Sequence, residues 1–197
     1  MRKKSHIALS RFLVQKASKE EFLLYRKNLY IGSILPDCVP SFFSRRHTIE
    51  NTLFIVQDQI KYLMEEHKVE QGLNQVFFRK LGIITHYIAD YFTFPHNKIF
   101  TGSISQHCYY ENQLKHRLRE CLTNGDIEIQ CVKQDEFLTV NDVMEYIIET
   151  HENYLKVAKE VETDIEFIVS VCWNVVNAIV RCVEIRTKNQ ALILNTV

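Results

Sequence analysis

Residues that interrupt secondary structure are scarce in this chain. Only five glycines and three prolines occur among its 197 residues, and no internal repeat or low-complexity linker separates one part from another. Gly and Pro are the strongest local breaks in regular structure, so long uninterrupted elements are expected. Together with a hydrophobic content of 46%, this predicts one domain, residues 1–197, with a substantial core.

An excess of charge of either sign is also missing. Lysine and arginine together number 24, as do aspartate and glutamate, so the formal net charge is zero. Binding to a long nucleic acid rests mainly on neutralising its phosphates, which requires a basic surplus. Stable nucleic-acid binding is therefore not expected.

The cysteines show no metal-binding or disulfide pattern. None of them has the Cys-x2-Cys spacing, and the chain does not resemble a small secreted disulfide framework, so reduced thiols are expected. Cys38 and Cys108 adjoin candidate metal ligands, but sequence neighbours point in different directions, which favours a packing role for both. The six are Cys38, Cys108, Cys121, Cys131, Cys172 and Cys182.

Long hydrophobic runs are absent as well. The longest apolar stretch, residues 165–180, contains Glu166 and several polar residues, so it is too short and too polar for a membrane span. It predicts a core helix that carries the only tryptophan, Trp173. The N-terminal Met-Arg-Lys-Lys is not followed by the apolar core and small-residue cleavage site of a signal peptide. A cytoplasmic protein without a transmembrane segment is expected.

What the chain does contain is helical periodicity from end to end. The fold is predicted to be all-α, a single-domain bundle of several helices. Residues 124–136 are expected to form a loop, with a short extended piece at 127–132. The predicted helices cover residues 6–17, 20–33, 49–68, 71–93, 104–123, 139–161 and 163–187.

One predicted helix carries an unusual pair of ionisable residues. His86 and Asp90 are the only side chains between Leu81 and Phe94 that carry charge near neutral pH. Their spacing places them on one face of a helix that is apolar nearly all round, so both are expected to be buried. A buried carboxylate is costly unless it is paired or binds a metal, and neutral imidazole is the commonest metal ligand. The pair therefore indicates a buried metal.

Further nitrogen and oxygen donors accompany this pair along the chain. Zinc accepts such ligands, and a catalytic zinc typically has three of them plus a water. Eight donors exceed the needs of one ion, so the bundle is expected to enclose a polynuclear metal site, an arrangement that activates water and clamps phosphoryl oxygens. The candidate ligands are His6, Asp37, His47, His86, Asp90, His96, His107 and Glu111.

Several spaced motifs in this region resemble a known family. The string Leu-Gly-x3-His-Tyr-x2-Asp-x4-Pro-His-Asn begins at Leu81, His-x3-Glu begins at His107, and Gly-x3-Pro-Asp begins at Gly32. Together, and in this order, they resemble the zinc-dependent phospholipase C family, which shares an all-α superfamily with single-strand-specific zinc nucleases. The resemblance covers His6 to Glu111.

The resemblance implies a zinc centre and a role for each donor. The first zinc would be held by four residues and the second by three, while His6 and a bridging Asp90 would hold a third. A metal-bound water would attack the phosphorus of a phospholipid or another small phosphodiester, with Asp37 as the general base. The first set is Asp37, His47, His86 and Asp90, and the second is His96, His107 and Glu111.

Two features depart from the family's pattern. Secreted relatives use an N-terminal residue, a Trp in the best-known members, to help bind the third zinc, whereas this chain begins with Met1. Two zinc ions and three both remain open. Members that cleave phosphatidylcholine build a choline pocket from acidic and aromatic residues. The corresponding positions in this chain hold residues that are neither acidic nor aromatic, and two phenylalanines lie only near them in sequence. A choline-specific substrate is therefore not expected. Those positions are Lys3, Lys4, Cys38 and Ser44, and the phenylalanines are Phe42 and Phe43.

Each candidate ligand also has a plainer interpretation. Asp37 follows a proline and could stabilise a turn, and Glu111 could pair with Lys115 one helical turn later. His86 and Asp90 could form a hydrogen-bonded pair in the core. The remaining histidines lie among charged residues and are interpreted as surface residues; they are His67, His116 and His151.

The sequence therefore predicts a zinc-dependent phosphodiesterase resembling phospholipase C. Two alternatives remain: a catalytically decayed member that keeps its metals for stability or partner binding, and a nuclease-like or nucleotidase-like activity. Another helical class of metal-dependent phosphohydrolases needs a His-Asp dipeptide, and a di-iron bundle needs Glu-x2-His pairs. Neither pattern occurs in the sequence. The oligomeric state is left open.

Overall fold

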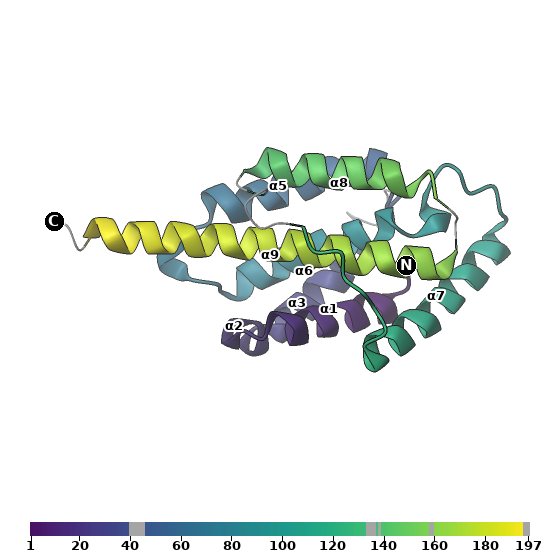
Figure 1. Cartoon of the computed structure of the whole chain (residues 1–197), viewed down its shortest axis with the longest axis horizontal. Coiled ribbons are helices and arrows are strands. Elements are labelled where there is room, and N and C mark those ends of the chain that lie inside the picture. Colours follow the sequence, from purple (N-terminus) through teal and green to yellow (C-terminus); the bar gives the residue numbers. More distant parts are fainter. Residues whose placement is uncertain (40–45, 133–136, 138, 158–159, 195–197) are drawn as a thin grey trace.

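A computed structural model describes residues 1–39, 46–132, 137, 139–157 and 160–194, and Figure 1 shows the arrangement of its helices. The fold is all-α, as predicted, with no strand in the described ranges. The main helices are α1 Lys3–Ala17, α2 Glu20–Leu24, α3 Arg26–Ile34, α5 Ile49–Lys61, α6 Gln75–Tyr91, α7 Ile104–Asn124, α8 Val140–Tyr154 and α9 Val161–Leu194. Four short helical turns join them: η1 Leu35–Asp37, η2 Tyr62–Glu66, η3 Val69–Gln71 and η4 Phe94–His96.

Several helix boundaries differ from the predicted ones. The predicted helix 20–33 is broken into α2 and α3 at Tyr25. Helix α6 begins only at Gln75, because the Asn74 side chain accepts hydrogen bonds from two backbone amides of its first turn. Residues 127–132 form no strand, and this segment is held instead by the side chains of Ser170 and Asn174.

Helices α3 and α6 lie in unusually close contact at two glycines. A methyl group added at Gly82 would lie 2.3 Å from the carbonyl oxygen of Leu29, and one at Gly32 would lie 2.1 Å from that of Arg79. Only a residue without a side chain fits at either position. This contact fixes α6 against the end of α3, which leads directly into Asp37.

Helix α9 extends along most of the molecule, with α8 on one side and α1, α3 and α7 on the other (Figure 1). Its middle part is buried among the hydrophobic residues of the core, which confirms the predicted core helix. The helix is longer than predicted, and residues Val161–Leu192 are long and apolar enough to cross a membrane by length and composition alone. Of its most apolar window, 67% is buried inside the protein, as in a core helix.

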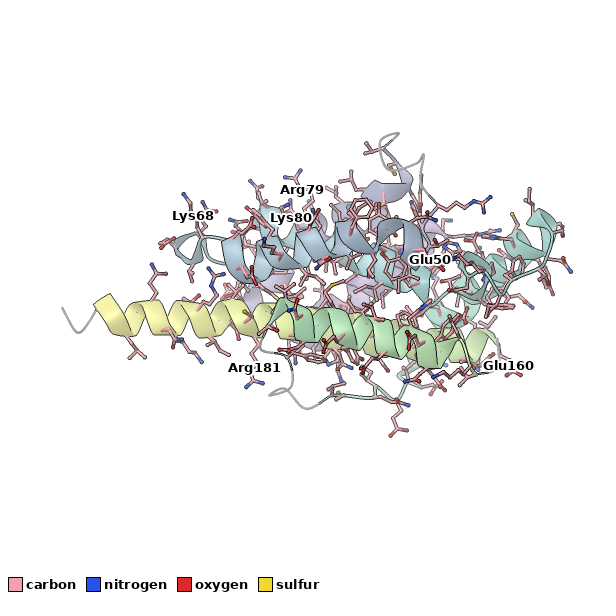
Figure 2. The ribbon with its side chains drawn as sticks, turned by 90° about the horizontal axis from the view of Figure 1, so that it is seen from above. Glu50, Lys68, Arg79, Lys80, Glu160 and Arg181 are labelled. Atoms are coloured by element: carbon pink, nitrogen blue, oxygen red, sulfur yellow. The ribbon has the colours of Figure 1, made fainter. Side chains whose placement is uncertain are left out.

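Charged side chains lie around the outside of the bundle. Lys68, Arg79 and Glu160 point away from the helices (Figure 2). The six cysteines are all free, as expected. Cys38 and Cys108 are exposed, however, so the packing role predicted for these two is wrong. Cys38 directly follows η1, Cys108 lies on α7, and both face solvent and not the core.

Candidate metal centre

Helix α6 places His86 and Asp90 in the middle of the protein. Residues from Phe77 to Tyr91 are buried almost without interruption, because this apolar helix is covered on several sides by α3, α5 and α9. Both ionisable side chains are fully buried, with 0% exposure, as the sequence predicts. A charged pair at this depth requires compensating partners.

Two further predicted donors, His47 and Asp37, converge on these two residues. The Nδ1 atom of His47 lies 3.0 Å from Asp90 Oδ2 and 3.0 Å from His86 Nε2. An Asp37 oxygen lies 3.8 Å from each of these two ring nitrogens. The Nδ1 atom of His86 is 2.8 Å from the carbonyl oxygen of Ser33. An N–H donated there leaves the Nε2 lone pair directed at the other three donors, which is the usual way of orienting a histidine ligand.

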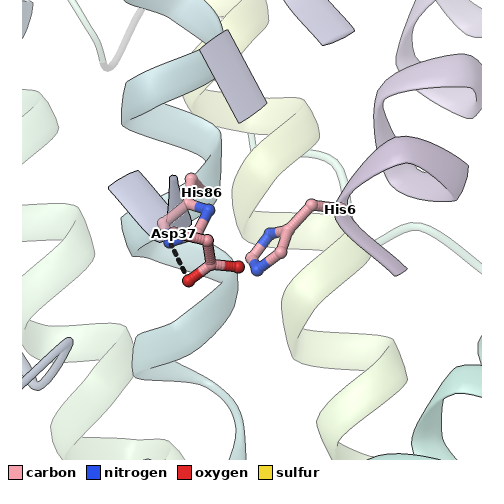
Figure 3. A group of neighbouring side chains, drawn as sticks. All are labelled: His6, Asp37 and His86. Carbon is pink, nitrogen blue, oxygen red and sulfur yellow. Dashed lines mark ion pairs between the residues drawn. The ribbon is translucent and has the colours of Figure 1, made fainter. Parts of the chain in front are cut away.

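His6 completes this group from α1. Its ring stacks on that of His86, with centroids 4.0 Å apart, and its Nε2 lies 3.5 Å from Asp90 Oδ1. Figure 3 shows His6, Asp37 and His86 directed toward one another, with the Asp37–His86 ion pair marked. Both ring nitrogens of His6 are buried and have no hydrogen-bond partner. A buried imidazole without a hydrogen-bond partner, placed among carboxylates, is suited to bind a cation.

A second group of donors lies beside the first, where η4 meets α7. The Nε2 atoms of His96 and His107 each lie 3.3 Å from the same oxygen of Glu111. His96 Nδ1 is 3.6 Å from Asp90 Oδ1, so Asp90 lies between the two groups. Glu111 interacts with these histidines, and its proposed surface pairing with Lys115 does not occur, since that lysine donates to Asn112.

The amino group of Met1 lies at the junction of the two groups. It is 2.6 Å from Asp90 Oδ1, 3.0 Å from His96 Nε2 and 3.1 Å from Glu111 Oε1. This position holds Met rather than Trp, and only His6 and a bridging Asp90 were predicted to hold a third ion. The contact depends on the backbone amine rather than on the side chain, so residue type could not reveal it.

Electrostatics keep the donors in the forms that a cation requires. Burial alone favours the neutral acid of Asp90, but the Met1 ammonium and the surrounding histidines hold the pKa of that carboxyl well below its usual range. Burial likewise favours protonation of Glu111, whereas hydrogen bonds from His107 and His96 keep its pKa far below normal. Burial also lowers the pKa of His86 and of His96. Carboxylates and neutral imidazoles are the ligand forms.

A buried carboxylate that the sequence analysis missed holds the bend before His96. Asp164, at the start of α9, accepts hydrogen bonds from the backbone amide of Phe94 at 2.8 Å and from the hydroxyls of Tyr110 and Tyr154 at 2.8 and 2.6 Å. Phe94 begins η4, so Asp164 ties the segment bearing His96 to α9. It acts on the centre only through this positioning.

Two histidines predicted to lie on the surface are buried. His151 is 5% exposed, and its Nε2 lies 2.8 Å from the Asn97 side-chain oxygen. The Asn97 amide in turn donates to two carbonyls at the end of α6. His67 is 1% exposed and contacts the carbonyl oxygen of Gly72. The prediction was wrong for both because it used charged sequence neighbours rather than helix faces. His116 is exposed, as predicted.

The centre opens into a cavity of about 710 Å³. Asp37 and three of the histidine donors, His47, His96 and His107, line it. Its remaining wall combines two cations, a phenyl ring and small or polar residues. These are Arg46, Thr48, Pro95, Asn97, Lys98, Phe100, Gly102, Ser103 and Ile104.

The region expected to lack a choline pocket is only partly described. Phe42, Phe43 and Ser44 lie outside the described residues. Lys3 and Lys4 face a different hollow, away from the cavity described above. In the described lining of the cavity, Asp37 is the one acidic residue.

The donor set fits zinc in its chemistry. The three groups of neighbouring donors contain only imidazole nitrogens and carboxylate oxygens, and within each group one atom per residue lies within 4.8 Å of the others. Zinc takes such ligands readily. The groups are His6, Asp37 and His86; His47, His86 and Asp90; and His96, His107 and Glu111.

Comparison with known proteins agrees with this chemistry. A family model described as zinc dependent phospholipase C matches residues 5–161, which include all eight donors. No curated protein and no solved structure matches the chain. Since the family model spans well over half of the residues, the chain belongs to the zinc-dependent phospholipase C family.

Proposed function

We propose that this protein is a zinc-dependent hydrolase that cleaves a phospholipid or another small phosphodiester. The observation that carries the proposal is the convergence of the donor groups at the floor of an open cavity. Asp37 connects the metal donors with the cavity. Its carboxylate lies beside two histidine donors, and its side chain also lines the cavity. When bound, zinc supplies Lewis-acid activation of water and neutralises charge on phosphate oxygens.

The ligand roles follow the grouping of the donors. Asp37, His47, His86 and Asp90 would hold one ion, and His96, His107 and Glu111 a second. The position of His6 beside Asp90 supports a third, which the Met1 amine would help to hold once it has lost its proton. Two or three ions per chain are therefore proposed.

Asp37 is the proposed general base. Its side chain is 21% exposed, whereas Asp90 is fully buried and Glu111 is 15% exposed, so Asp37 is the carboxylate most accessible to a water in the cavity. It would take the proton from the water as that water's oxygen attacks phosphorus and the alkoxide leaves. Arg46 and Lys98 on the wall would hold the anionic diester in place.

The described wall of the cavity also supports a substrate without a choline head group. A quaternary ammonium is usually recognised by several aromatic faces or by carboxylates. This wall offers one phenyl ring, Phe100, and two cations. We expect an anionic or neutral head group to be cleaved faster than choline. Equal concentrations of phosphatidylcholine and phosphatidylglycerol in mixed micelles would test this, and faster cleavage of phosphatidylcholine would contradict it.

The function itself is tested by zinc content and hydrolysis together. Protein purified without chelator should contain two or three zinc ions per chain by elemental analysis and should hydrolyse phospholipids or soluble phosphodiesters. Asp90→Asn should lose both zinc and activity. Asp37→Asn should keep more of its zinc and lose about 100-fold or more in turnover, the range of a lost general base.

An exposed acidic residue provides the matched control. Asp58→Asn, on the surface of α5, should change neither zinc content nor turnover. Bound zinc with no hydrolysis of any phosphodiester would instead support a decayed member that keeps its metals for structure. Absence of zinc even after reconstitution would refute the metal centre.

A further inference from the structure

A second hollow lies away from the metal centre, between α1, the end of α3 and α7. Its volume is about 370 Å³, and it shares no lining residue with the cavity above the metal centre. Its lining residues are Lys3, Lys4, Ile7, Ala8, Arg11, Ile34 and Arg119. We refer to these seven residues as the basic groove.

The charge of this groove is entirely positive. Four of its seven residues are cations, and none is acidic. Helix α1 contains no Asp or Glu at all, although the whole chain has zero net charge. Among the described residues, no carboxylate forms an ion pair with any of the four cations, whereas Arg117 on the same α7 pairs with two glutamates. Four neighbouring cations repel one another, so the groove favours a negatively charged ligand.

The floor of the groove is apolar, and this limits the kinds of anionic ligand that the groove can bind well. Ile7, Ala8 and Ile34 are only partly buried and lie among the cations. Ile31, one helical turn before Ile34 in α3, is 50% exposed. Exposed aliphatic residues beside lysine and arginine suit the interface of a phospholipid bilayer, where head-group phosphates lie next to hydrocarbon. A nucleic acid would contact the same cations but would leave these isoleucines without a counterpart.

We infer that the basic groove docks the protein on membranes that contain anionic phospholipids. The lysines and arginines contact head-group phosphates, while Ile31 and Ile34 contact the upper part of the hydrocarbon region. This inference is independent of the proposed hydrolysis, because it uses no metal ligand. Lys3 lies two residues after Met1, which contacts the metal centre, so the groove and the centre share the N-terminal segment of the chain.

Vesicle co-sedimentation tests the inference with the full chain in its purified, zinc-containing form. The probes are vesicles of phosphatidylcholine alone and vesicles of phosphatidylcholine with about 30% phosphatidylserine. Binding should be stronger to the anionic vesicles and should weaken at high salt. In Lys4→Gln/Arg11→Gln, two exposed cations of the groove are removed. At roughly fivefold per basic residue, binding should fall about 30-fold.

The control removes the same two residue types elsewhere. Lys68→Gln/Arg79→Gln changes one exposed lysine and one exposed arginine outside the groove, both visible in Figure 2, and should bind like the original protein. Circular dichroism should show that both double variants keep their helical content. An equal loss in both variants would mean that binding reflects total charge, which would overturn the inference.

Other ligands of the groove give different outcomes. Inorganic phosphate at millimolar concentration that abolishes vesicle binding would assign the groove to a small soluble phosphate. A single-stranded oligonucleotide bound only through Lys4 and Arg11 would assign it to nucleic acid. No preference for anionic vesicles, or unchanged binding in Lys4→Gln/Arg11→Gln, would also overturn the inference.

Discussion

At the scale of single residues, Asp164 shows how a side chain without contact to the metal donors can control one of them. It is fully buried, and its hydrogen bonds with Phe94, Tyr110 and Tyr154 join η4, α7 and α8 to the first turn of α9. The family match ends at residue 161, so this carboxylate lies just beyond the matched region. The position of His96 therefore depends on a helix that the motif resemblance did not cover.

Replacement of this carboxylate should weaken both fold and metal binding. In Asp164→Asn, one of the two acceptor oxygens becomes an NH₂ group that cannot accept, so either the bonds from Phe94 and Tyr110 or the bond from Tyr154 are lost, and the charge that strengthens the remaining ones is removed. Since hydrogen bonds to a charged group each contribute about 1.5–3 kcal/mol, we expect a loss of about 2–4 kcal/mol in the free energy of unfolding by urea. Zinc affinity should fall about 10–100-fold, as for other residues that position ligands.

The matched variant is Tyr154→Phe, which removes one donor and leaves the carboxylate. It should cost about 1.5–3 kcal/mol and leave zinc affinity nearly unchanged, because the Phe94 contact remains. Zinc titration under conditions in which both variants are folded separates the two effects. Normal zinc affinity in folded Asp164→Asn would show that η4 is held by other contacts.

The same contacts predict a dependence on alkaline pH. Burial, together with the adjacent Asp164, raises the pKa of Tyr154 well above its ordinary value of 10. A phenol whose pKa is raised in the folded state stabilises the fold fully below pH 10, and this contribution is lost as pH rises further. The unfolding free energy should fall by up to about 1.4 kcal/mol per pH unit from this residue. Tyr154→Phe should show a shallower decline between pH 10 and 11 in urea titrations, and identical slopes would exclude the effect.

At the scale of elements, the centre depends on how closely α3 approaches α6. Gly82→Ala would place a methyl group 2.3 Å from the Leu29 carbonyl, and backbone on both sides would have to move. We expect a loss of about 3 kcal/mol or more in unfolding free energy, although alanine in a helix otherwise stabilises by about 1 kcal/mol. Thermal unfolding measures this directly. Gln75→Ala, exposed on the first turn of α6, is the control and should be neutral or slightly stabilising.

Helices could be predicted from the sequence where apolar residues recur on one face of the helix. The all-α class and the burial of α6 follow from apolar periodicity, and the ordered motifs brought together the eight donors. His151 was wrongly predicted to lie on the surface. It follows Val143 and Ile147 on α8 at intervals of four residues, and this apolar series could have indicated that His151 is buried. Asp164 gave no such signal, since an acidic residue in the first turn of a helix is usually explained by the helix dipole.

Other features depend on contacts between distant segments. The Met1 amine lies 89 residues from Asp90 in sequence, and its role comes from a backbone group that every chain possesses. The break at Tyr25 and the extension of α9 to Leu194 depend on packing, which overrides local helical preference. Sequence periodicity could not supply these boundaries.

At the scale of the whole molecule, the metal centre joins segments that are far apart in the chain. Its donors come from α1, η1, the residues before α5, α6, η4 and α7, so a bound ion links the N-terminal helix to the middle of the bundle. Two ring nitrogens of this centre, His47 Nδ1 and His86 Nε2, lie only 3.0 Å apart, and both nitrogens of His6 are buried without a hydrogen-bond partner. These groups make the metal-free protein less stable than its hydrophobic core alone would allow.

Removal of zinc should therefore lower the melting temperature of the whole chain. A ligand that binds only the folded state at a free concentration 100 times its Kd stabilises by about 2.7 kcal/mol. For a chain of this size each kcal/mol corresponds to about 2–4 °C, so reconstitution should raise the Tm by roughly 5–11 °C. Differential scanning calorimetry of chelator-treated and zinc-reconstituted protein measures the shift, and Asp90→Asn should show little of it. If wild-type Tm did not respond to zinc while zinc was bound, zinc would have to bind the unfolded chain as tightly as the folded one, and the eight donors would not form a site that depends on the fold.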